Sequence, residues 1–197
     1  MRHPSTKQLF DYWNLRRDGR AAPDRADIDP GAIRGILADT FILALDQAAG
    51  HPFRIAGTRI CAAFGRELKG ESFLNLWDAS SRGLVRDLTK VVGNEVIGAL
   101  ANVRGTSSAG THEIELLLLP ITYRGFPRAR ILGALTPRDP AHWVDGQNLT
   151  TLSLGGFRYL SPNLDRAPSI VPERPDGRIR HGFVVYDGGR PSDTAKI

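Results

Sequence analysis

The sequence contains a single cysteine, Cys61, among its 197 residues. One cysteine excludes an intramolecular disulfide and a zinc site built from several cysteines, and it fits a reducing compartment. No window approaches eighteen consecutive apolar residues, and the first residues lack the apolar segment of a signal peptide. We therefore expect a cytoplasmic protein without a membrane span.

Long runs of like charge are also missing, although the net charge is +5 and the pI is about 9.8. Such a charge attracts nucleic acid, anionic lipid or acidic partners. The basic residues are mostly arginines scattered through expected loops, which favours a generic basic surface. A basic protein associated with nucleic acid stays open as an alternative, and its retention on nucleic acid would fall steeply with salt.

Catalytic motifs are absent as well. The sequence has no Gly-x-Ser-x-Gly elbow and no His-Glu-x-x-His helix. Gly65 and Gly70 have the spacing of a phosphate loop, but Glu71 stands where the phosphate-binding lysine would be. Residues 112–115, His-Glu-Ile-Glu, match the His-x-Glu half of a zinc deaminase only superficially, and the Pro-Cys-x-x-Cys partner is missing. We expect no catalytic activity, with an enzyme of unrecognised type and a small-molecule pocket as an alternative.

What is present is the pattern of one α+β domain. An apolar share of 41% and a charged share of 24% indicate a folded globule. Apolar spacing and turn residues predict helices at 5–17, at 29–37, after Gly57 and at 81–92, and strands at 40–45, 53–56, 96–105, 112–122 and 128–136. Residues 149–160 are expected to add a strand or a docking segment.

Details within this pattern are also predicted. Ser5 and Thr58 are expected to cap their helices. The helix at 81–92 should bury Leu84, Leu88, Val91 and Val92, which share one face. The expected divisions are a helical lead at 1–38, a core at 39–137, a docking segment at 138–161 and, because it is rich in proline and polar residues, a flexible tail at 162–197.

Two stretches of the sequence resemble one known family. They are residues 12–30, with Tyr12-Trp13, Arg17, Gly19-Arg20, Pro23, Arg25 and Asp27-Ile28-Asp29-Pro30, and residues 53–77, with FRIAGTRIC, FGRELKG, Phe73 and Leu76-Trp77. With the order of elements, residues 5–160 resemble the bacterial single-domain PAS family that includes MopJ-like proteins. The resemblance implies a PAS fold, in which short helices and one longer helix cover one face of a five-stranded antiparallel sheet. An N-terminal lead helix and an extended C-terminal tail would flank it.

The resemblance also implies a role. PAS domains enclose a pocket between the sheet and the short helices, and many serve for dimerisation. We expect a sensory or adaptor module of bacterial signalling that binds a small ligand or a partner protein and shifts a conformational equilibrium. Phe10 and Trp13 on the lead helix are the candidate surface for a partner or a homodimer. The candidate pocket residues are Phe53, Ile55, Ile60, Cys61, Phe64, Phe73, Trp77, Leu116, Leu118 and Ile131.

The sequence gives little support for a bound flavin or haem. A flavin photoadduct needs cysteine in an Asn-Cys-Arg context, whereas Cys61 precedes Ala62-Ala63 and is expected to be a small buried hydrophobe. Haem needs an axial histidine or methionine facing the pocket. None of the five histidines lies on the helix where PAS haem ligands tend to occur; they are His3, His51, His112, His142 and His181. We expect no metal, haem or flavin; the ligand, the partner and the stimulus stay open.

Overall fold

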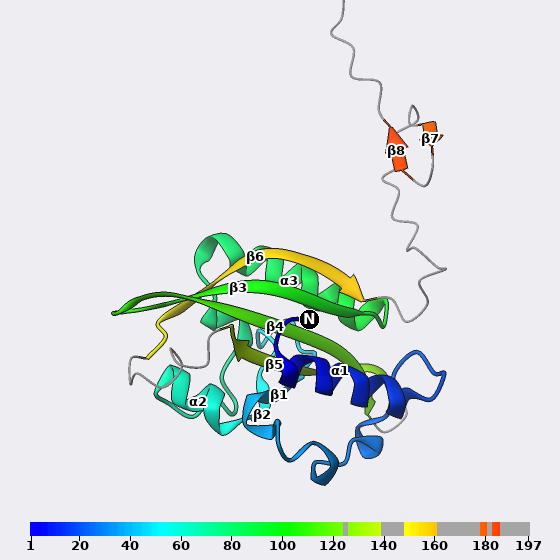
Figure 1. Ribbon diagram of the computed structural model, residues 1–197, viewed down its shortest axis with the longest axis horizontal. Coiled ribbons are helices and arrows are strands. Elements are labelled where there is room, and N and C mark those ends of the chain that lie inside the picture. The colour runs from blue at the N-terminus through cyan, green and yellow to red at the C-terminus, as the bar shows by residue number, and fades with distance from the viewer. Residues whose placement is uncertain (124–125, 139–147, 161–177, 181–182, 186–197) are drawn as a thin grey trace, which may run out of the picture. The chain divides into compact units, whose positions relative to one another are not determined.

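Figure 1 shows the computed structural model of the protein, which describes residues 1–123, 126–138, 148–160, 178–180 and 183–185. The chain divides into two compact units, Met1–Pro162 and Asn163–Ile197. In the second unit β7 (Arg178–Arg180) pairs antiparallel with β8 (Phe183–Val185). The rest of the tail predicted to be flexible lies outside the described residues, as do His142 and His181.

The first unit is built on one antiparallel sheet with the strand order β2-β1-β5-β4-β3-β6. Its strands are β1 (Thr40–Ala44), β2 (Phe53–Ala56), β3 (Gly98–Ser107), β4 (Gly110–Tyr123), β5 (Phe126–Pro137) and β6 (Thr151–Leu160). The predicted fold class is confirmed. The sheet has six strands rather than five, because β6 pairs along the edge of β3 from Thr151 to Leu160 and buries Leu152 completely.

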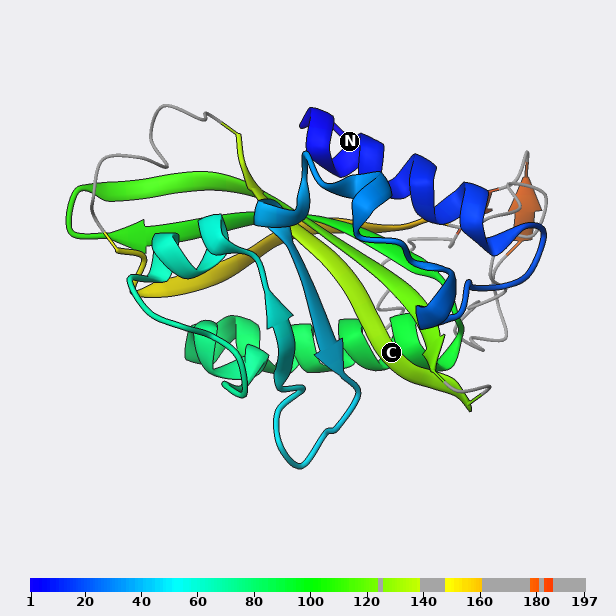
Figure 2. The same cartoon turned by 90° about the horizontal axis from the view of Figure 1, so that it is seen from below.

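Both faces of this sheet are covered. Side chains alternate between the two faces of a strand, and β4 is buried without interruption from Ile114 to Ile121. Ile114, Leu116 and Leu118 belong to one apolar cluster, and Leu117, Leu119 and Ile121 belong to another. Figure 2 shows the sheet between α1 on one side and α2 with α3 on the other. We call these sides the α1 face and the α3 face.

The α3 face is covered by α2 (Thr58–Phe64), η4 (Phe73–Leu76) and α3 (Ala79–Asn94), where η denotes a short 3-10 helix. Gly57, not Thr58, is the N-cap of α2. A Cβ at Gly57 would lie 2.3 Å from the carbonyl oxygen of Ala38, so only glycine fits this close approach.

The buried face of α3 differs from the prediction. Val85 is fully buried, whereas Leu84 is 57% exposed. Both residues fit a helical spacing with Leu88, so periodicity alone did not choose between them. The rotation of α3 is set by its first turn, where the hydroxyl of Ser81 accepts a hydrogen bond from the Leu154 backbone N–H of β6 at 2.8 Å.

The α1 face is covered by α1 (Pro4–Arg17) and by the short helices η1 (Arg25–Asp27), η2 (Gly31–Ile33) and η3 (Leu37–Asp39). The N-cap of α1 is His3 rather than Ser5, and the His3 Nδ1 accepts the Ser5 N–H at 3.2 Å. The helical segment predicted at 29–37 is broken into η2 and η3. Ile33 of η2 and Ile36, the residue before η3, join Leu9 and Trp13 of the lead in one cluster.

Candidate functional site

The interior between the sheet and the helices of the α3 face is where the sequence placed a ligand pocket. Eight of the ten candidate residues are buried there in a single apolar cluster, and Cys61 packs against it half-buried. Ile55 lies elsewhere, since it is 48% exposed on the edge strand β2. The eight are Phe53, Ile60, Phe64, Phe73, Trp77, Leu116, Leu118 and Ile131.

Aromatic rings fill part of this interior. Phe73 lies against Phe53, Phe41 and Trp77, with ring centroids 5.7, 5.8 and 5.6 Å apart. Phe41 of β1 was not among the predicted pocket residues, although its place in an apolar strand was a signal for it. Gly133 of β5 makes room for Phe41, because a Cβ there would lie 2.2 Å from its ring. These side chains contact one another and therefore fill space in which a ligand would have to lie.

Cys61 has no sign of thiolate chemistry. Burial raises the pKa of its thiol, and the carboxylate of Glu67 raises it further. The Sγ atom lies 3.6 Å from Glu67 Oε1. A thiol with a raised pKa stays protonated and is a poor nucleophile.

Three buried nitrogens on His51 and Trp77 have no hydrogen-bonding partner among the described residues. They are both ring nitrogens of His51 and the indole nitrogen of Trp77. Burial lowers the pKa of His51, and the nearby Asp46 opposes that effect. Buried polar atoms without partners cost stability, so these nitrogens are the least satisfied polar atoms in the described part of the protein.

The lead helix corrects the predicted partner surface. Trp13 is 1% exposed and lies in the α1-face cluster, where its indole N–H donates to the Pro120 carbonyl of β4 at 2.8 Å. Phe10 is half-buried and stacks on Trp13 with centroids 6.2 Å apart. Trp13 is therefore part of the protein's own core, because β4 offers an apolar strand and a free carbonyl group at that point.

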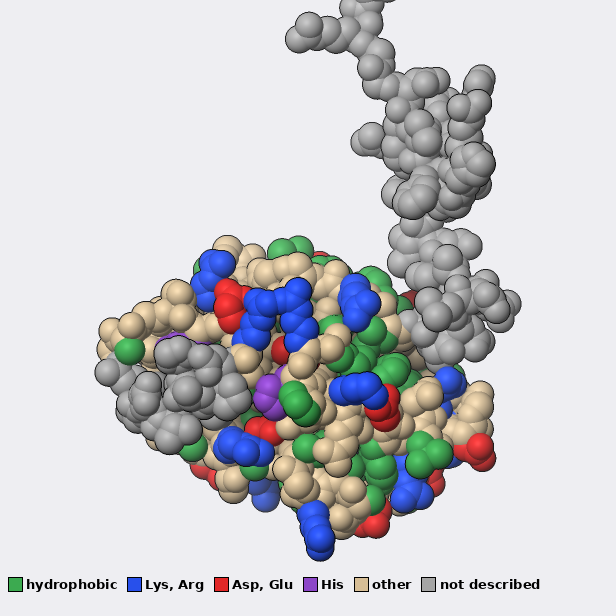
Figure 3. All heavy atoms as spheres, in the orientation of Figure 1, with side chains coloured by type: hydrophobic (Ala, Val, Ile, Leu, Met, Phe, Trp, Pro, Cys, Tyr) green, Lys and Arg blue, Asp and Glu red, His purple; other side chains and the backbone are tan. Residues whose placement is uncertain are grey.

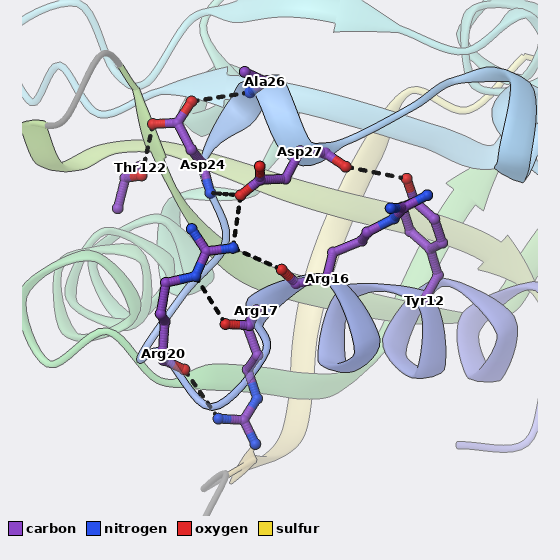
Figure 4. Close-up of polar contacts among 8 residues, drawn as sticks. All are labelled: Tyr12, Arg16, Arg17, Arg20, Asp24, Ala26, Asp27 and Thr122. Carbon is purple, nitrogen blue, oxygen red and sulfur yellow. Dashed lines mark hydrogen bonds and ion pairs between the residues drawn. The ribbon is translucent and has the colours of Figure 1, made fainter.

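A polar network holds the end of α1 to the sheet (Figure 4). The Arg20 guanidinium donates to the carbonyl groups of Arg16 and Arg17 at 2.8 and 2.9 Å and pairs with Asp27 at 2.7 Å. That hydrogen bond from Arg20 is the main reason why the pKa of Asp27 is lowered. Asp24 accepts from the Thr122 hydroxyl of β4 at 2.8 Å. Residues 12–30, which carry much of the family resemblance, thus position the lead.

A second contact holds the beginning of the lead. The carboxylate of Glu115 on β4 accepts the backbone N–H groups of Arg2 and His3 at 2.9 and 3.2 Å. Nearby, the hydroxyl groups of Thr6 and Thr136 lie 3.0 Å apart, and Thr136 donates to the Glu115 carbonyl at 3.3 Å. In the sequence Glu115 appears only as the last residue of the segment 112–115. Its partners come from residues more than a hundred positions away, so no local pattern revealed them.

Two cavities of about 250 and 340 Å³ lie beside Glu115. Both are lined by Arg2, Asn102 and Glu115, and together we call them the Arg2 cleft. The first is also lined by Arg138, and the second by Arg158 of β6. Figure 3 shows Lys and Arg side chains gathered on this side of the molecule, over β3 and β6.

A groove of about 490 Å³ runs between α1 and η2. Leu15, which lines it, is 73% exposed. We call it the α1 groove, and its remaining lining residues are Pro4, Lys7, Gln8, Asp11, Tyr12, Ala32 and Ile33.

Two features, a membrane-spanning helix and a metal-binding group of side chains, are absent from the described residues. No helix among them is long and apolar enough to cross a bilayer. Within the same part of the chain, no three His, Cys, Asp or Glu side chains are grouped so that they could hold a metal ion.

Comparison with known proteins gives one family. A family model described as PAS domain matches residues 1–136, which run from the start of α1 to the end of β5. A comparison with curated proteins finds no match. The matched residues include both the lead and the helices of the α3 face.

Proposed function

This chain belongs to the PAS domain family, and on that premise we propose that it is a non-catalytic interaction module of cytoplasmic bacterial signalling that pairs with a second copy of itself. The α1 groove is the proposed contact surface. The observation that carries this proposal is Leu15, a large apolar side chain that is 73% exposed on a helix whose opposite side is anchored in the core.

The packed interior favours a role at the surface. Eight candidate pocket residues are buried against one another, and the rings of Phe53, Phe73 and Trp77 are in contact. A ligand there would have to displace these side chains, which cores packed at crystal-like density resist. Signalling by contact with another protein requires no such displacement.

The charges beside Leu15 fit a second copy. Lys7 and Asp11 line the α1 groove and form an ion pair one helical turn apart on α1, with side chains 69% and 55% exposed. In a two-fold interface the same patch meets itself. A patch with one charge of each sign can therefore place Lys7 opposite Asp11 of the partner subunit, with Leu15 buried in the same contact.

Leu15→Glu tests this surface. We expect sedimentation equilibrium to give a dimer for the wild-type protein and a monomer for the variant, because a carboxylate would be buried in the apolar contact. Leu84→Glu is the matched control, since Leu84 is also exposed but lies on α3. Deletion of the lead is unsuitable, because it would remove Trp13 from the core.

Exchange of the two charges sharpens the test. Lys7→Glu should weaken the dimer, and the double variant Lys7→Glu with Asp11→Lys should restore it. A wild-type protein that is monomeric at every concentration would refute the proposal. Equal dimerisation of the Leu15→Glu and Leu84→Glu variants would do the same.

A further inference from the structure

The Arg2 cleft lies on the part of the α1 face that is formed by β3, β4 and β6 beside the start of the lead. Its two cavities share three residues, and their volumes lie near the lower end of those of small-molecule sites. Its walls belong to the amino-terminal segment and the sheet, so it is distinct from the α1 groove, with which it shares only Pro4, and from the aromatic part of the α3-face interior.

The charge of the cleft is positive. Arg2, Arg138 and Arg158 line it, against the single carboxylate of Glu115. Arg138 lies 3.9 Å from Glu113, a long contact between exposed side chains. Such a pair contributes little, so it leaves most of the charge of Arg138 available.

Two of these arginines have their donors unused. Within the described part of the chain, the side chains of Arg2 and Arg158 make no hydrogen bond, ion pair or ring contact, and neither does the Asn102 amide between them. A guanidinium group presents several N–H donors in a planar fork that matches the oxygens of a phosphate or carboxylate group. The donors that line this cleft are therefore suited to an oxyanion.

The wall that carries Arg2 is held in place. The Glu115 side chain accepts the backbone N–H groups of both Arg2 and His3, and Glu115 is 7% exposed. The negative charge of Glu115 is thereby used within the protein, and the position of the Arg2 backbone is fixed. With the backbone anchored, only the side-chain rotamers of Arg2 remain to be ordered when a ligand binds.

We propose that the Arg2 cleft binds a small organic anion through a phosphate or carboxylate group held by Arg2 and Arg158. The Asn102 amide supplies a further donor, and Arg138 adds positive charge. The two cavities together have room for a molecule larger than the oxyanion alone. This site is independent of the proposed dimer surface, since it shares no lining residue with the α1 groove other than Pro4.

Titration calorimetry with inorganic pyrophosphate and with malonate, at constant ionic strength, tests the site. We expect the wild-type protein to bind at least one of them. Arg2→Gln with Arg158→Gln should weaken that binding at least tenfold, because charge-assisted hydrogen bonds are lost. The matched control is Arg34→Gln with Arg54→Gln, which removes the same charge from exposed positions outside the cleft, and it should stay within twofold of the wild type.

Three results would overturn the proposal. The first is a wild-type protein that binds neither anion. The second is equal weakening by the two double variants, which would indicate a general basic surface. The third is binding of single-stranded DNA that is far tighter than that of the small anions and is weakened by both double variants, which would indicate a nucleic-acid surface. Arg2 and Arg158 are both exposed, so thermal unfolding of the variants should match that of the wild type.

Discussion

On the α3 face, Phe41, Phe53, Phe73 and Trp77 from neighbouring segments pack ring against ring. On the α1 face, the contacts that fix the lead are hydrogen bonds between residues far apart in the chain. Trp13 donates to Pro120, Asp24 accepts from Thr122, and Glu115 holds the first residues. Both coverings use apolar packing and hydrogen bonds, but aromatic rings fill the α3 face, whereas hydrogen bonds to β4 fix both ends of the lead on the α1 face.

The difference concerns specificity. Apolar packing is strong but has no direction, so it tolerates an unpartnered indole N–H on Trp77. A hydrogen bond requires one donor opposite one acceptor, so it fixes where the lead lies along β4. Ring packing therefore stabilises the α3 face, and the hydrogen bonds of the α1 face set the position of the segment that we propose as the partner surface.

Loss of a ring from the α3 face should have the largest effect. Phe73→Ala removes a side chain that contacts three other rings, and large-to-small changes of this kind cost about 3–5 kcal/mol. Urea unfolding measures the loss. Leu84→Ala, at an exposed position on α3, should change the unfolding free energy by less than about 0.5 kcal/mol. A small loss for Phe73→Ala would mean that the interior is loosely packed and open to a ligand.

The two buried tryptophans allow a direct comparison of the faces. Both are 1% exposed, but the Trp13 N–H has an acceptor and the Trp77 N–H has none. Trp13→Phe leaves the Pro120 carbonyl without its donor, so it should cost about 1–3 kcal/mol more than Trp77→Phe. Urea unfolding of both variants gives the difference. Equal costs would show that the hydrogen bond adds nothing to the α1 face.

A smaller effect is expected at His51. Its pKa is lowered by burial, so below the ordinary histidine pKa of about 6.5 the unfolded chain binds a proton that the folded protein does not. Stability should therefore fall as the pH drops below that value, by at most about 1.4 kcal/mol per pH unit. His51→Leu should lack this dependence, because it removes the titrating ring with its two unpartnered nitrogens.

The same variant tests whether those nitrogens have a partner. His51 has a positive φ of 58°, which leucine adopts less readily than histidine, so only a loss well above about 1–2 kcal/mol of backbone strain counts as the loss of a partner. A large loss of stability at pH 7 would indicate that a bound molecule satisfies the histidine. Native mass spectrometry of the freshly purified wild-type protein would then show the added mass.

Sequence patterns predicted most of the α3 face. Alternating and helical apolar spacings are local, so they placed the helices and the strands β1 to β5 within a few residues, and most of the candidate interior is buried as one cluster. Where two residues fitted the apolar spacing of a helix equally well, the sequence did not determine which of them is buried. Leu84 and Val85 both fit the α3 spacing, and the bond between Ser81 and Leu154 of β6 decided which of them is buried.

The sequence by itself determined the fold class, the order of elements and the family resemblance, because these depend on which residue types recur at short spacings. Tertiary structure alone decided that Trp13 is core, that β6 completes the sheet, and that Arg2 and Arg158 line one cleft. In each of these cases the residues that meet in space lie at least 45 positions apart in the chain. No local sequence pattern predicts such a long-range contact, since it results from the pairing of whole strands.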